Sequence, residues 1–232
     1  MKHIASISFG KDSLAMLLLI IEHKLPLDEV IFYDTGMEFD AIYKTRDKAV
    51  KMLDRLGIKY TELKPPMPFE DRMYNYPYIS RKGEQKQGYG WCGGVCRWGT
   101  KEKTRAMDNY CKTLGEDVKQ YIGIAIDEPL RLERLQENRV APLAEFGFTE
   151  KMALEYCYKH GFDWLETKGG AEPVRLYDIL DRVSCWCCRN KNLKELANYK
   201  KYLPAYYKRL QELEDKIGEP MKKPKYLKER FI

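Results

Sequence analysis

Two groups of residues in this chain have the types and spacing of chemical sites. The first is the segment 8–13, Ser-Phe-Gly-Lys-Asp-Ser, which leads directly into an apolar helical run. Backbone N–H groups at the start of a helix are unpaired, and the helix dipole favours negative charge there. Gly10 permits backbone angles that other residues resist. Ser8 and Ser13 offer hydroxyl donors, and Lys11 adds a positive charge. The segment therefore predicts a phosphate site, although its spacing is not that of a Walker A loop.

The second group consists of cysteines. Cys92 and Cys96 form a Cys-x₃-Cys pair, and Cys185, Cys187 and Cys188 follow much later in the chain. Two close pairs that are far apart in sequence can converge on one metal site. Four thiolates suit tetrahedral Zn²⁺ or a [4Fe–4S] cluster. The pattern therefore predicts a metal centre and leaves zinc and iron–sulfur both open.

The composition and net charge of the chain limit the class of protein and the kinds of substrate that it suits. The chain has 232 residues, of which 33% are charged and 44% hydrophobic, as expected of a globular protein. No apolar run reaches the ~18–20 residues that span a bilayer, and the first residues lack the apolar core of a signal peptide. We therefore expect a cytoplasmic protein with no membrane partner. The net charge of +6 suits an anionic substrate such as a nucleotide and permits nucleic acid. Seven cysteines argue against disulfides in such a compartment, and we expect Cys111 and Cys157 to be core residues.

An alternation of strands and helices must position these groups. Strands are predicted at 4–8, 29–33, 58–63 and 118–125, and helices at 12–22, 41–56, 97–114 and 149–160. This order predicts an α/β fold, with a parallel sheet wrapped by helices and a helical, cysteine-containing C-terminal extension.

The remaining segments complete the expected organisation. A long loop is predicted at 64–90 and an extended tail at 218–232, with two helices between the last cysteines and the tail. We expect residues 1–145 to form the nucleotide-binding core. Residues 146–232 are expected to form the helical region that completes the four-cysteine site.

Polar residues follow the second and fourth predicted strands. Asp34 and Glu38 come after the second strand, and Asp127 and Arg131 after the fourth. In an open parallel sheet, ligands lie outside the carboxyl ends of the strands, where the strand order reverses. The guanidinium of Arg131 suits phosphate oxygens. The same residues also suit a simple turn, or a surface helix in which arginines pair with glutamates.

Together these motifs resemble the PP-loop proteins of the phosphoadenosine phosphosulfate (PAPS) reductase-like family. The matching segments are Ser-x-Gly-x-Asp-Ser at 8–13, Asp-Thr-Gly-x-x-Phe at 34–39, Gly-x-x-x-Asp-Glu and a following arginine at 123–131, and Arg-x-x-Cys-x-x-Cys at 182–188. The resemblance covers about residues 4–190 and implies a Rossmann-like PP-loop fold that binds ATP with Mg²⁺. The catalytic residues that it implies are Lys11, Asp12, Asp34 and Arg131. The nucleotide-binding residues that it implies are Ser8, Phe9, Gly10, Lys11, Asp12, Ser13, Asp34, Thr35, Gly36, Glu38, Arg97, Lys101, Gly123 and Asp127.

For the cysteines, the resemblance implies a [4Fe–4S] cluster, with Zn²⁺ as the alternative. Its ligands would be Cys92, Cys96, Cys185 and Cys188. The Cys-x₃-Cys spacing departs from the adjacent cysteines of the cluster-bearing reductases, and Cys187 could replace a neighbour as ligand.

A second departure shapes the expected activity. Reductases of this family carry a cysteine nucleophile in a C-terminal tail, and this sequence has no cysteine after Cys188. We therefore expect an enzyme that cleaves ATP to AMP and pyrophosphate and adenylylates an acceptor, with a sulfur donor as a further partner. The acceptor could be tRNA, DNA or a small metabolite. Two alternatives stay open: a sulfonucleotide reductase that uses Cys187 or an external thiol, and a nucleotide-binding regulator with a structural metal.

Overall fold

The computed structural model describes residues 1–115, 117–170 and 172–230, and the chain folds into two compact units. Unit 1 consists of Met1–Asp34, Ile42–Leu63 and Thr104–Trp164. Unit 2 consists of Thr35–Ala41, Lys64–Lys103 and Leu165–Ile232. The segments of the two units alternate along the chain. The expected boundary between two domains at residue 145 stays a prediction.

Unit 1 contains a parallel sheet. Its strands lie in the order β3-β2-β1-β6-β7. Their bounds are β1 Lys2–Ile7, β2 Glu29–Tyr33, β3 Lys59–Leu63, β6 Val118–Ile122 and β7 Arg139–Val140. The chain builds outward from β1 to β2 and β3, then returns to add β6 on the other side of β1. The strand order therefore reverses at β1, which is where open parallel sheets bind ligands.

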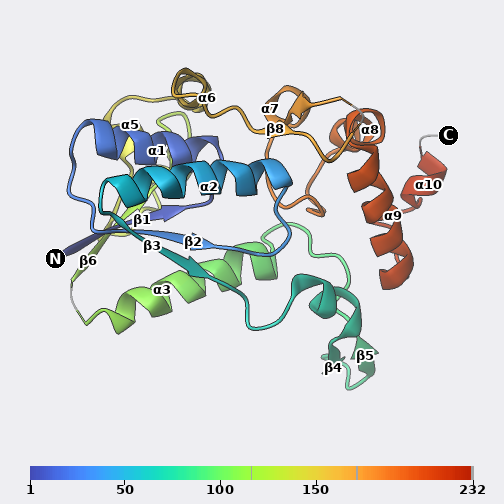
Figure 1. Ribbon diagram of the computed structural model, residues 1–232. Coiled ribbons are helices and arrows are strands. Elements are labelled where there is room, and N and C mark those ends of the chain that lie inside the picture. The colour runs from blue at the N-terminus through green and yellow to red at the C-terminus, as the bar shows by residue number, and fades with distance from the viewer. Residues whose placement is uncertain (116, 171, 231–232) are drawn as a thin grey trace. The chain divides into compact units, whose positions relative to one another are not determined.

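Helices cover both faces of this sheet. Helices α1 (Lys11–Glu22) and α2 (Asp40–Arg55) cover one face, and α3 (Lys103–Thr113) covers the other (Figure 1). Every residue of β2 is buried, as expected for a parallel strand packed on both sides. On the α3 face, Ile4 and Ile31 pack against Met107 and Cys111. The predicted parallel α/β fold is confirmed.

Three short or capped helices complete unit 1. Their bounds are α4 Pro129–Leu132, α5 Pro142–Glu145 and α6 Glu150–Lys159. Thr149 caps α6 as predicted, because its Oγ1 accepts a hydrogen bond from the Met152 amide at 3.2 Å. Helix α6 packs against α1. The predicted strand at 118–125 ends early, at Ile122, because the chain turns there and the Ile124 amide bonds back to the Ile122 carbonyl.

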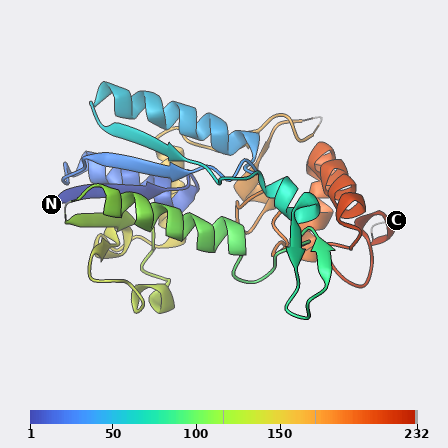
Figure 2. The same cartoon turned by 90° about the horizontal axis from the view of Figure 1, so that it is seen from below.

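Unit 2 begins with turns and a hairpin. Its first elements are the π-helical turn η1 (Asp71–Asn75), strands β4 (Pro77–Ile79) and β5 (Gln85–Gln87), and the π-helical turn η2 (Arg97–Glu102). Strands β4 and β5 pair antiparallel and project from η1 as a hairpin (Figure 2). The predicted helix at 97–114 is thus two structures, η2 followed by α3. The turn η2 is wider than an α-helical turn, because the Lys101 amide donates to the Cys96 carbonyl five residues earlier.

The C-terminal part of unit 2 is mostly helical. Its elements are β8 Leu165–Glu166, β9 Val174–Arg175, α7 Leu176–Ile179, α8 Leu193–Tyr202, α9 Pro204–Ile217 and α10 Leu227–Arg230. The prediction of an extended tail is wrong for residues 218–230. Met221 and Leu227 are buried, and both of their amides donate to the carboxylate of the buried Glu214 on α9. Across the described ranges, no helix is both long and apolar enough to cross a membrane.

Candidate functional site

Residues 8–13 lie at the carboxyl end of β1, where the strand order reverses. Phe9, and not Gly10, takes the left-handed backbone conformation in this loop, with φ of 55° against −78° at Gly10. The conformational role expected for Gly10 is therefore wrong. Burial holds Phe9 in place: its ring packs edge-on to Phe32 at 5.0 Å, and its carbonyl accepts a hydrogen bond from Trp164 Nε1 at 2.7 Å.

The two loop serines face each other. Their hydroxyl oxygens are 3.1 Å apart, and the Ser8 amide donates to Ser13 Oγ at 3.1 Å. Ser13 also donates to the Gly10 carbonyl at 3.2 Å. Helix α1 begins after Gly10, and among the described residues no side-chain hydrogen bond caps it. The loop thus combines a helix N-terminus with two convergent hydroxyls, which suits phosphate oxygens.

Gly123, at the end of β6, lies against the start of α1. A Cβ atom at this position would lie 2.7 Å from the Ser13 amide nitrogen and 2.9 Å from the Asp12 carbonyl carbon. Both neighbours are backbone atoms that cannot move aside. Only glycine therefore lets β6 approach the phosphate loop this closely.

Charged groups of unit 1 surround the same loop. The Lys11 ammonium donates to Asp12 Oδ1 at 2.8 Å and to Glu150 Oε2 at 2.5 Å. Burial raises the pKa of the Asp12 carboxyl, and the hydrogen bond from Lys11 opposes that change. Asp127 accepts the amide of Glu150 at 3.1 Å, so Asp127 holds the first turn of α6 beside Lys11.

Asp34 and Arg131 have other close contacts within unit 1. Asp34, nearly buried, accepts a hydrogen bond from the Tyr43 hydroxyl at 2.8 Å. Arg131 forms a two-point ion pair with Glu128, at 2.6 and 2.8 Å. The Arg131 side chain is about half exposed, which is the arrangement of the surface-helix alternative.

Thr35, Gly36 and Glu38 belong to unit 2. Gly36 has a φ of 75°. Thr35 donates to Glu38 at 2.9 Å, and its hydroxyl lies 3.6 Å from the Cys185 sulfur. The Cys185 thiol donates to Glu38 at 3.7 Å. These residues are predicted nucleotide ligands, and the contacts within unit 2 join Thr35 and Glu38 to a cysteine.

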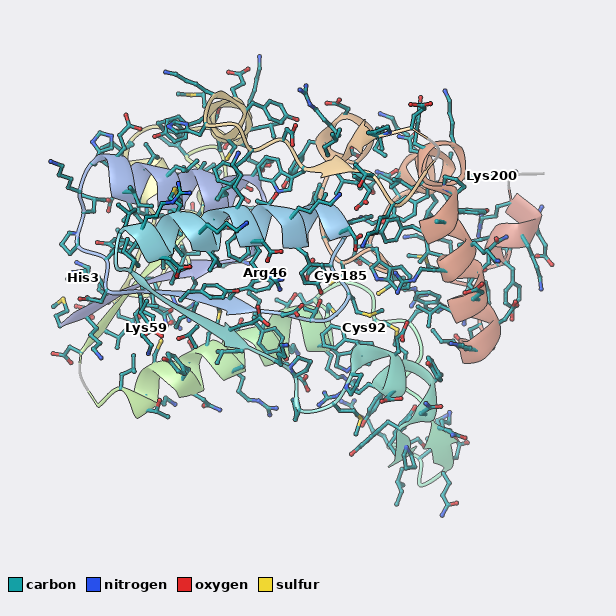
Figure 3. All side chains as sticks on the ribbon, in the orientation of Figure 1. His3, Arg46, Lys59, Cys92, Cys185 and Lys200 are labelled. Atoms are coloured by element: carbon teal, nitrogen blue, oxygen red, sulfur yellow. The ribbon has the colours of Figure 1, made fainter. Side chains whose placement is uncertain are left out.

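The five cysteines of the two sequence motifs line one cavity of about 500 Å³ in unit 2. Cys92 and Cys185, labelled in Figure 3, are two of them. A Cβ atom at Gly99 would lie 3.7 Å from the Cys96 sulfur and 3.9 Å from the Cys185 sulfur. The segments around Cys96 and Cys185 therefore meet, although 88 residues separate them. By contrast, Cys111 and Cys157 are buried in unit 1, as predicted.

Backbone amides already point at two of the sulfurs. The Arg97 amide donates to Cys92 at 3.1 Å, and the Gly99 amide donates to Cys96 at 3.3 Å. Such bonds stabilise thiolates. In the described part of the chain, no three His, Cys, Asp or Glu side chains are arranged so that they could hold a metal ion. The donor types and their shared cavity fit a sulfur-ligated centre, and the sulfurs would have to draw closer to bind one.

Two lysines that the sequence analysis overlooked border the cysteines. Burial lowers the pKa of Lys103, which lies near Glu38 and Cys185. Lys191 lines the cavity with 2% of its surface exposed, and burial lowers its pKa also. Neither lysine carried a sequence signal, because each is a single charge in a basic chain.

Glu150 and Trp164 were also overlooked at the phosphate loop. Glu150 could have been suspected, because a carboxylate in the first turn after a Thr cap is a familiar helix start.

The remaining predicted ligands, Arg97 and Lys101, lie in η2 of unit 2. The Arg97 guanidinium lies over the Tyr89 ring at 4.7 Å.

Comparisons with known proteins give a family match and a curated relative. Residues 2–129 match a protein family described as "Phosphoadenosine phosphosulfate reductase domain". A curated relative, "Uncharacterized protein MJ0066" of Methanocaldococcus jannaschii, is 24% identical over 212 residues. The match covers 87% of this chain and 39% of the relative, so this chain spans well under half of the relative's length.

One solved structure has a distant likeness to the whole chain. It is the U34-tRNA thiolase NcsA from Methanococcus maripaludis with its [4Fe–4S] cluster. The TM-score is 0.46 and the sequence identity 17%, over 94% of this chain and 72% of that one.

Proposed function

This chain belongs to the phosphoadenosine phosphosulfate reductase domain family, and from that premise we propose that it is a PP-loop enzyme that cleaves ATP to AMP and pyrophosphate. The acceptor is adenylylated and is then attacked by a sulfur or nitrogen nucleophile, and AMP leaves with the electron pair of the bond that breaks. The observation that carries the proposal is the phosphate loop, with its serine pair and its helix start against Gly123.

In this proposal, the loop binds the β- and γ-phosphates. Ser8 and Ser13 donate hydroxyl hydrogen bonds, and amides of the first turn of α1 point at the anion. Lys11 contributes the positive charge, which it now shares with Asp12 and Glu150. Asp34 is the carboxylate proposed to orient Mg²⁺, which would neutralise phosphate charge.

The transfer of AMP from ATP to the acceptor involves no change of oxidation state. An acceptor oxygen or nitrogen forms a bond to the α-phosphorus of ATP. The bond from that phosphorus to the bridging oxygen of the β-phosphate breaks, and pyrophosphate leaves with the electron pair. The acceptor's proton passes to solvent. Positioning and charge stabilisation supply most of what this step requires.

The cysteine cavity is the proposed metal centre. Cys92, Cys96, Cys185 and Cys188 would hold a [4Fe–4S] cluster, or Zn²⁺ in the alternative, and Cys187 lies in the same cavity. A cluster bound there would fix the two cysteine segments together and could carry sulfur to the activated acceptor. Amides of Arg97 and Gly99 would stabilise two of the thiolates.

Nucleotide binding tests the proposal most directly. We expect Lys11→Ala to weaken binding of a non-hydrolysable ATP analogue, measured by calorimetry, by about tenfold or more, because its charge-assisted contact to phosphate is lost. Lys151→Ala, an exposed lysine on α6, is the matched control. Unchanged affinity in the Lys11→Ala variant would refute the phosphate-loop assignment.

The family match also favours a second candidate, a sulfonucleotide reductase. Sulfite release from PAPS in the presence of thioredoxin would support this candidate. Release of pyrophosphate from ATP, dependent on Lys11, would support the first. Tight nucleotide binding with neither product would indicate a regulator.

A further inference from the structure

A hairpin in unit 2 presents tyrosines and cations together. We call it the tyrosine hairpin and define it by Tyr76, Tyr78, Arg81, Lys82, Lys86 and Tyr89. Strands β4 and β5 form its two arms, and Figures 1 and 2 both show it projecting from η1. Two such short strands bury little apolar surface between themselves, and Tyr76 stays 37% exposed.

The tyrosine rings of the hairpin are stacked. Tyr78 lies 4.3 Å from Tyr89 with 22° between the ring planes, and Tyr76 lies 5.7 Å from Tyr89 with 19° between them. Nearly parallel rings offer flat faces on which a nucleic-acid base can stack. Tyr76 is 37% exposed, so the stack reaches the surface.

The hairpin also carries exposed cations, and one of them, Lys86, pairs across the strands with Tyr78. Arg81, Lys82 and Lys86 are exposed, and the acidic residue in this turn is Glu84, which pairs with Lys86 at 3.1 Å. Gln85 and Gln87 add exposed amide groups on β5. Flat stacking surfaces flanked by cations are the two components with which proteins bind single-stranded nucleic acid.

The stack continues toward the cysteine cavity within unit 2. The Arg97 guanidinium lies over Tyr89 at 4.7 Å, and Tyr89 meets Trp98 edge to face at 6.4 Å. Trp98 lines the cavity, and the amide of Arg97 donates to the Cys92 sulfur. The aromatic cluster at the base of the hairpin therefore adjoins the cysteine cavity.

We propose that the tyrosine hairpin binds a single-stranded nucleic acid, with bases stacked on the tyrosines and phosphates paired with the three cations. This strand is the acceptor of the proposed reaction. Its role as acceptor rests on the proposed function, whereas its binding to the hairpin requires no ATP and can be measured separately.

The test is fluorescence anisotropy of the full-length protein with labelled oligo(U) and oligo(dT) of about 12 nucleotides, a length within the range of single-strand sites. We expect Lys82→Glu with Lys86→Glu to weaken binding at least tenfold. The slope of log affinity against log salt concentration should also become shallower by about 1.4 in this variant. That is the value for two lost phosphate contacts on a single strand. Lys151→Glu with Lys208→Glu changes the charge equally on α6 and α9, and should keep the wild-type salt dependence.

A second pair of variants separates stacking from charge. Tyr76→Leu should weaken binding about fivefold or more, because a base loses its aromatic platform, and Tyr76→Phe should restore it. Equal losses in the hairpin and control charge variants, or no loss with Tyr76→Leu, would overturn the inference. Pyrophosphate release from ATP is measured in parallel, so failure of the hairpin and failure of the ATP chemistry give different results.

Discussion

The Lys11 ammonium lies 2.5 Å from Oε2 of Glu150, the first residue of α6. The same lysine stands in the phosphate loop, 139 residues earlier in the chain. Because Asp127 accepts the Glu150 amide, the position of this carboxylate is set by the loop after β6. A bound triphosphate and Glu150 would therefore compete for one positive charge.

This competition predicts the effect of Glu150→Gln. Removing the carboxylate charge should tighten binding of an ATP analogue by about threefold, since a half-exposed ion pair is worth up to ~1 kcal/mol. Calorimetry measures the change, and Glu155→Gln on the same helix is the control. Weaker binding by the variant would mean that Glu150 positions Lys11 for phosphate instead of competing with it.

Gly123→Ala should disrupt the phosphate loop. The added methyl group would lie 2.7 Å from the Ser13 amide nitrogen, and crowding of this kind costs about 1–3 kcal/mol. We expect a lower melting temperature and a marked loss of nucleotide affinity. Gly93→Ala is the control, because its methyl group would meet only the Arg189 side chain, at 3.5 Å. A variant with wild-type affinity and stability would contradict the close packing of β6 on α1.

Asp12 predicts a specific dependence of stability on pH. Burial raises the pKa of its carboxyl above the usual 3.8, so ionisation of Asp12 costs the folded state more than the unfolded state. The Asp12 contribution to stability is therefore most favourable below pH 3.8 and declines as the pH rises through the raised pKa. Asp12→Asn should raise the melting temperature at pH 7 and reduce this decline. An unchanged pH profile in thermal unfolding would show that the bond from Lys11 offsets the burial.

The cysteines predict which substitutions remove the metal. Cys185→Ser should abolish most of the bound metal and any absorption near ~400 nm in anaerobically purified protein. Cys111→Ser should retain both, because Cys111 packs against the sheet of unit 1. Cys187→Ser decides whether this third cysteine of the cavity is a ligand. Metal content that survives Cys185→Ser would contradict the proposed centre.

Glu214 predicts how firmly the tail is held. Its two carboxylate oxygens accept the buried amides of Met221 and Leu227, at 2.7 and 2.8 Å. Glu214→Gln turns one acceptor into a donor facing a donor, which should cost about 1–3 kcal/mol of unfolding free energy in denaturant titrations. The neighbouring Asp215→Asn, which is exposed, should cost almost nothing.

The sequence predicted four of the five strands of the parallel sheet, because these strands alternate with helices of clear period, and it missed the two-residue β7. It also predicted the strand–turn–helix at residues 8–13, the Thr149 cap and the buried state of Cys111 and Cys157. Each of these depends on neighbours in the sequence or on a compact motif. The predicted roles of the nucleotide and metal ligands stay predictions.

Other features could not be read from local pattern. The ion pair of Lys11 and Glu150 joins residues that only the packing of α6 on α1 brings together. The left-handed backbone conformation of Phe9 could not be predicted from the sequence, because it is unusual for a bulky residue. Contacts with Phe32 and Trp164 maintain it. The folded tail depends on a buried carboxylate, and a glutamate on a helix ordinarily indicates a solvated face.

The interleaving of the two units limits which parts of the gene for this protein recombination can move as a unit. The chain passes from one unit to the other after residues 34, 41, 63, 103 and 164. No single cut therefore yields a fragment that consists of one complete unit alone, and no exchange of a contiguous gene segment can transfer all of unit 1 without part of unit 2. A segment that carries all of unit 1 takes Cys92 and Cys96 with it and leaves Cys185, Cys187 and Cys188 behind, so a recombination that moves unit 1 divides the cysteine site.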